Sequence, residues 1–73
     1  MTQQTSAISV KDCIRFIRER LDGAVAVAKA AEACAEAGDA GRALAIMLDA
    51  EQPLYEATTL LNAASRLHRR TSP

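Results

Sequence analysis

The chain has 73 residues, and its nine basic side chains balance nine acidic ones to a formal net charge of zero. With 49% hydrophobic and 25% charged residues, the composition is that of an ordinary folded domain and excludes general disorder. A chain this short forms one domain at most and buries little of its surface. It therefore needs cross-links, a metal, very tight helix packing or association to be stable.

The N-terminal segment, residues 1–8, is predicted to be a flexible lead. Residues 1–6 are polar and uncharged, whereas a secretory signal begins with a basic region followed by an apolar stretch. No apolar run reaches the about 20 residues that a membrane-spanning helix needs. Two cysteines are too few for a disulfide framework. Together these features predict a cytoplasmic protein with free thiols and no association with a membrane.

The first helix is predicted over residues 10–37. Ser9 has the residue type of an N-cap, and Asp12 completes an approximate capping box. Gly38 suits the left-handed position that follows a helix end. Apolar residues recur between these signals at alternating spacings of four and three, as in a coiled-coil seam that is large at first and then all alanine. They are Val10, Ile14, Ile17, Leu21, Ala24, Ala28, Ala31 and Ala35.

The second helix is predicted over residues 40–70, with Asp39 as its N-cap. Pro53 has no N–H for the Asp49 carbonyl and clashes with it, so we expect the helix to be kinked near Pro53 or broken near residues 51–52. The kink is favoured because the heptad phase continues through Pro53. Residues 71–73 are predicted to be a frayed tail. The seam of this helix consists of Met47, Ala50, Leu54, Ala57, Leu61, Ala64 and His68.

Two helices of nearly equal length, joined by a short turn at residues 38–39, predict an all-α fold, an antiparallel two-helix hairpin over residues 9–70. The apolar arc of each helix is wider than one neighbouring helix can cover. This excess predicts that the hairpin dimerises into a four-helix bundle. The residues expected to bind a partner lie off the two seams. They are Phe16, Val27, Tyr55, Leu60 and Leu67, with Arg15, Arg18, Arg66 and Arg69 as a polar rim.

The zero net charge conceals a separation of charge along the predicted hairpin. Residues 10–20 and 60–73 lie at its open end and hold seven basic and two acidic residues, whereas the remainder holds two basic and seven acidic ones. Part of this pattern has an ordinary explanation, because basic residues suit a helix C-terminus and pairs such as Arg15–Glu19 and Arg18–Asp22 have ion-pair spacing. Two such rods side by side would still prefer the orientation in which opposite charges meet. We therefore expect an antiparallel homodimer that salt weakens.

The sequence contains no motif that indicates catalysis. Cys13, Cys34 and His68 lack the clustered spacing of a zinc site, and neither a catalytic triad nor a phosphate-binding glycine loop is present. The two cysteines are 21 residues apart on one helix, too far for an intramolecular bridge. They are interpreted as buried thiols, with a bridge between antiparallel copies of the first helix as the alternative. We expect no enzyme activity, no metal or other cofactor and no small-molecule substrate.

The sequence therefore predicts a small non-enzymatic protein-interaction module, such as an adaptor, inhibitor or regulator. It would bind itself and another protein through apolar helix faces. The alternative is a small dimeric regulator that binds nucleic acid through the basic open end. That end has few aromatic side chains on which bases could stack, since only Phe16 is nearby.

Overall fold

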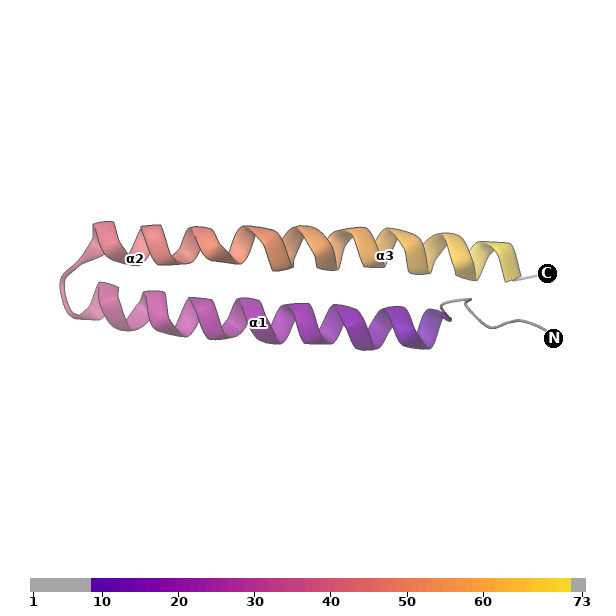
Figure 1. Cartoon of the computed structure of the whole chain (residues 1–73), viewed down its shortest axis with the longest axis horizontal. Coiled ribbons are helices and arrows are strands. Elements are labelled where there is room, and N and C mark those ends of the chain that lie inside the picture. The colour runs from indigo at the N-terminus through magenta and orange to yellow at the C-terminus, as the bar shows by residue number, and fades with distance from the viewer. Residues whose placement is uncertain (1–8, 72–73) are drawn as a thin grey trace.

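The computed structural model describes residues 9–71, which form two helical rods (Figure 1). The first rod is helix α1 (Val10–Glu36). The second consists of α2 (Ala40–Met47), the short 3-10 helix η1 (Leu48–Ala50) and α3 (Glu51–Thr71). No strand occurs within residues 9–71, so the predicted all-α class is confirmed. The predicted flexible lead at residues 1–8 and residues 72–73 of the predicted frayed tail lie outside the described residues.

The start of α1 is fixed by the capping box that the sequence predicts. The Asp12 amide N–H donates to the Ser9 Oγ at 3.0 Å, and the Ser9 amide N–H donates to the Asp12 carboxylate at 3.4 Å. These bonds satisfy two of the backbone donors that a helix N-terminus leaves without partners. They also favour the ionised carboxylate, so the Ser9 backbone and hydroxyl, assisted by Arg15, lower the pKa of Asp12.

The turn between the rods is closed by backbone hydrogen bonds around Gly38, whose φ is 94°. The Gly38 N–H donates to the Ala35 carbonyl and the Asp39 N–H to the Cys34 carbonyl, both at 3.0 Å. This pattern is a Schellman motif, which needs a left-handed residue and therefore favours glycine. The Asp39 side chain then accepts from the Arg42 N–H at 3.0 Å and begins α2. The predicted caps at Gly38 and Asp39 are thus confirmed.

The second rod continues through Pro53 without a sharp bend (Figure 1). The irregularity expected near this proline lies one turn earlier, where η1 replaces the α-helix over Leu48–Ala50. Because α3 begins at Glu51, Pro53 occupies its first turn. A helix tolerates proline there, since first-turn N–H groups have no intrahelical acceptor. The change of helix type therefore accommodates Pro53 in place of the predicted kink or break.

The two rods run side by side in opposite directions, with the start of α1 and the end of α3 at the same end (Figure 1). They form a single layer, because the structure measures 57 × 24 × 13 Å. The centre of the interface between them consists of small side chains, which let helix axes approach closely. The buried residues are Cys13, Ala24, Ala31, Ala43, Ala50, Ala57 and Ala64. Apart from Cys13, the buried interior of residues 9–71 is therefore made of alanine alone.

The seams predicted from the heptads are wrong in one respect. Their alanines at positions 24, 31, 50, 57 and 64 do face the other rod. Several of their large members do not. Ile14 and Leu21 remain 58% and 42% exposed, and Leu54 and Leu61 are exposed as well, whereas Val10 and Ile17 are half-buried. Close approach of the rods at the alanines turns each row of large side chains about a quarter-turn away from the interface. The described residues therefore bury small side chains fully, and their large side chains are either half-buried at the edge of the interface or exposed.

Candidate protein-interaction surface

Most of the exposed large hydrophobic side chains lie on one broad side of the paired rods. On α1, positions 14, 21, 28 and 35 recur every seven residues and so share one side of the helix. On the second rod, positions 47, 54 and 61 do the same. We call this surface the apolar face, and Val25 flanks it. Its large residues are Ile14, Leu21, Leu44, Met47, Leu54 and Leu61.

Two shallow hollows show that both rows belong to the same side. Near the turn, a hollow of about 360 Å³ lies between Ala28 and Ala35 of α1 and Leu44 and Met47 of α2. Further along, a second hollow of about 240 Å³ joins residues of both rods, Ile17, Leu21, Leu54, Ala57, Thr58 and Leu61. The first hollow is wide because its α1 side is alanine apart from Glu32. The α1 side of the apolar face is thus prominent at the open end and recessed near the turn, whereas Leu44 of α2 projects there with 64% of its surface exposed.

The opposite broad side has a different chemistry. The Arg20 Nε donates to the Glu56 Oε1 at 2.9 Å and joins α1 to α3. Both side chains are partly exposed, so this ion pair contributes little stability, but it fixes which residues lie level with each other on the two rods. A hollow of about 250 Å³ beside it is lined by this pair with Tyr55, Thr59 and Leu60. This side is therefore more polar than the apolar face.

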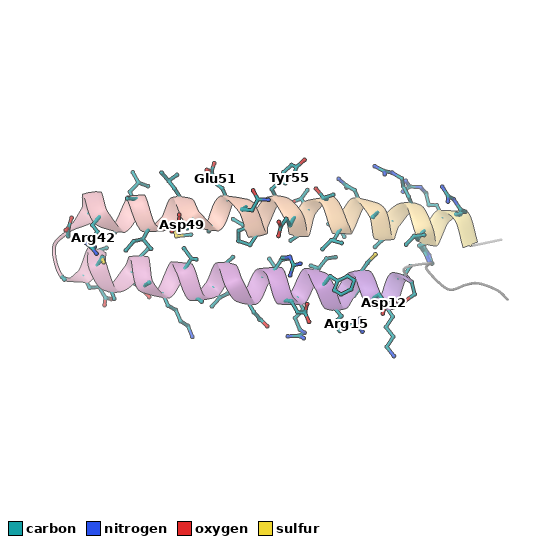
Figure 2. The ribbon with its side chains drawn as sticks, in the orientation of Figure 1. Asp12, Arg15, Arg42, Asp49, Glu51 and Tyr55 are labelled. Carbon is teal, nitrogen blue, oxygen red and sulfur yellow. The ribbon has the colours of Figure 1, made fainter. Side chains whose placement is uncertain are left out.

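The residues predicted to bind a partner are not gathered on the apolar face. The apolar ones other than Tyr55 are half-buried, namely Phe16, Val27, Leu60 and Leu67. Tyr55 is 69% exposed and points away from α1 at the outer edge of α3, as Glu51 does (Figure 2). The residues that mark the candidate site instead, such as Ile14 and Leu61, are members of the predicted internal seams. For Ile14, the small Cys13 one position before it is a signal that could identify it, whereas Leu61 stands between Leu60 and Asn62 and has no such signal.

All four arginines of the predicted polar rim are exposed. Arg18 donates to Asp22 at 2.8 Å, the pair that its spacing predicted. Arg15 bonds to Asp12 at 3.2 Å instead of the expected Glu19, and its guanidinium lies 5.1 Å from the centre of the Phe16 ring. Phe16 is thus half-buried with a cation beside it, which leaves it poorly placed to stack on a nucleic-acid base. Arg66 and Arg69 lie in the last turns of α3, where the helix dipole favours cations.

Within residues 9–71, no three His, Cys, Asp or Glu side chains gather in a way that would hold a metal ion. Cys13 and Cys34 are free thiols, and Cys13 is only 2% exposed because it packs between the rods. A bridge from Cys13 to a second copy would require these rods to separate. Neither described rod has an uncharged apolar stretch of the length required to cross a bilayer.

Comparisons with protein-family models, curated proteins and solved structures find no match to this chain. The candidate surface is therefore identified from the geometry of this chain alone.

Proposed function

We propose that this chain is a small non-enzymatic protein-interaction module that acts as an antiparallel two-helix hairpin. Its apolar face is covered by the same face of a second copy, and the two hairpins form a four-helix bundle. One observation carries the proposal. Within residues 9–71 the fully buried side chains are six alanines and Cys13, while six large hydrophobic side chains of the apolar face stand exposed.

The energetic argument begins with the interior. A buried alanine removes about one methyl group from water, worth roughly 0.8 kcal/mol, whereas a buried leucine contributes about 1.5–3 kcal/mol. The hairpin alone gains the smaller contribution at its fully buried positions and part of the larger one at half-buried residues such as Ile17 and Leu60, against the entropy cost of ordering a backbone of this length. Covering the apolar face adds the larger contribution at six positions in each copy. Association therefore provides the burial that one short chain lacks.

The dimensions of the apolar face suit such an interface. The hairpin is 57 Å long, 24 Å wide and one helix thick. A standard protein interface covers about 800 Å² on each partner, which fits within these limits. Exposed apolar patches of this kind usually mark interaction sites on soluble proteins. An amphipathic helix of another protein would compete for the same face.

Analytical ultracentrifugation of the full chain, with circular dichroism on the same samples, tests the proposal. We expect a dimer at micromolar concentration, and we expect helix content to fall on dilution because a separated hairpin loses its main source of burial. A chain that is monomeric at micromolar concentration and still fully helical would rule the proposal out.

A further inference from the structure

The apolar face differs in shape between its two ends. At the open end, Ile14 and Leu61 project with 58% and 56% of their surface exposed. Near the turn, the α1 side of the 360 Å³ hollow is made of residues 28, 31, 32 and 35. This i, i+3, i+4, i+7 set is the four-residue hole that receives one side chain in knobs-into-holes packing. Along α1, each copy therefore has a projecting part at the open end and a receiving part near the turn.

We propose that the two copies in the dimer run antiparallel, so that Ile14 of each enters the hole that Ala28, Ala31, Glu32 and Ala35 form on the other. This inference rests on the proposed function and adds the orientation and the register. The twofold axis would cross the helices at their middle, with α1 against α1 and α3 against α3.

The register follows from which residues of the two rods lie at the same height along the long axis of the hairpin. Because Arg20 is level with Glu56, Gly23 lies level with Pro53, halfway along the rods. Ile14 is nine residues from Gly23, about 14 Å along the helix axis. A half-turn about the middle places it level with residue 32 of the other copy, at the centre of the hole. The same half-turn places Leu61 of one copy beside Leu44 and Met47 of the other, which form the second wall of the hollow.

The parallel arrangement fits less well. Ile14 of one copy would then meet Leu61 of the other, so large side chains would be crowded at the open end. The two hollows would face each other near the turn and leave a poorly filled space. Cavities and overpacking both destabilise an interface. Shape complementarity thus favours the antiparallel dimer.

The charges favour the same orientation independently. The open end carries seven basic and two acidic residues, and the remainder carries two basic and seven acidic ones. Glu32 lines the hollow itself. An antiparallel dimer brings the basic end of each copy beside the acidic end of the other, whereas a parallel dimer brings like charges together. Complementary charge of this kind selects orientation.

Distances between spin labels separate the two orientations. In a chain with Cys13→Ala and Cys34→Ala, one label is placed at the open end through Arg69→Cys. A second sample carries the label near the middle through Ala26→Cys. The antiparallel dimer predicts about 50 Å between the end labels and below about 30 Å between the middle labels. Dimer affinity should also fall as salt rises.

Each alternative outcome has a distinct meaning. Short distances for both labels, with affinity that rises in salt, would mean a parallel dimer. That result would overturn the antiparallel inference and leave the interaction module intact. The absence of any distance below about 60 Å for the middle label would mean a monomer, which would overturn the inference together with the proposed function.

Exchanging a large and a small side chain between two positions tests the register. Ala35→Leu fills the hole and should weaken dimerisation by about tenfold or more. Adding Ile14→Ala to it exchanges the large and small positions and should restore much of the affinity. Ala33→Leu, at an exposed alanine on the outer side of α1, is the matched control and should leave dimerisation unchanged. Equal effects of Ala35→Leu and Ala33→Leu, or no recovery in the double variant, would overturn the register.

Discussion

Leu61 offers a quantitative test of the apolar face. It retains 56% exposure beside the other rod. Complete burial of a leucine contributes about 1.5–3 kcal/mol, so covering the exposed part adds about 1–1.5 kcal/mol in each copy. Leu61→Ala removes three of its four side-chain carbons. A dimer with two such sites should therefore lose about 1.5–2.5 kcal/mol, which raises Kd roughly 10- to 70-fold.

Leu48 provides a control with the same starting exposure of 56%. It lies seven residues before Tyr55, which points away from α1 at the outer edge of the second rod (Figure 2). Leu48→Ala removes the same atoms from a position that the proposed dimer leaves uncovered. Sedimentation equilibrium of the natural chain and both variants gives the three values of Kd.

The comparison between these variants decides the outcome. If Leu61→Ala and Leu48→Ala change Kd equally, the apolar face is not the interface and the burial argument fails. A general loss of helix would also weaken association, so circular dichroism at the highest protein concentration accompanies each measurement. We expect equal helix content for all three proteins under that condition.

Three further predictions concern the ends of the helices and can be checked by chemical denaturation followed by circular dichroism. Ser9→Ala removes the N-cap and should lower the free energy of unfolding by about 1 kcal/mol. The bonds from Ser9, with Arg15, lower the pKa of Asp12 below 3.8. The stability that the ionised Asp12 side chain adds to the fold is therefore present above pH 3.8 and is lost as the pH falls through the folded-state pKa. An Asp12→Asn variant should lack this acid-sensitive part. Gly38→Ala places a side chain at φ 94° and should cost about 1 kcal/mol, whereas Gly23→Ala, where a Cβ meets nothing within 4 Å, should stabilise by up to about 1 kcal/mol. If Gly23→Ala destabilises instead, a second chain contacts α1 at that position.

The helix ends could be predicted because their determinants are local. Ser9 with Asp12 and Gly38 with Asp39 act over three or four residues, and the hydrogen bonds found are those that their types imply. Pro53 shows the limit of such rules. The missing N–H predicts an irregularity nearby, but the choice between a kink and a 3-10 turn depends on how the second rod lies along α1.

The face that each helix presents could not be predicted from periodicity. On α1, the row through Cys13 and Arg20 and the row through Ile14 and Leu21 have the same seven-residue spacing, and they flank the buried Ala24 and Ala31 on opposite sides. A sequence reading places the larger residues inside because they gain more from burial. The structure turns the row of Cys13 and Arg20 inward instead, because the alanines on the second rod allow a close approach. The larger row is then left for a second chain, which one sequence does not show.

The alanine interior also constrains how this chain can diverge. Ala50 is 1% exposed, and Ala43, Ala57 and Ala64 repeat its environment at seven-residue intervals. Any larger side chain at these positions would force the rods apart along their whole length, whereas the polar outer surfaces can change freely. Homologous chains should therefore keep a ladder of small residues every seventh position even after overall identity has been lost. A search pattern built on that ladder and on the glycine of the turn would recognise distant relatives that ordinary similarity misses.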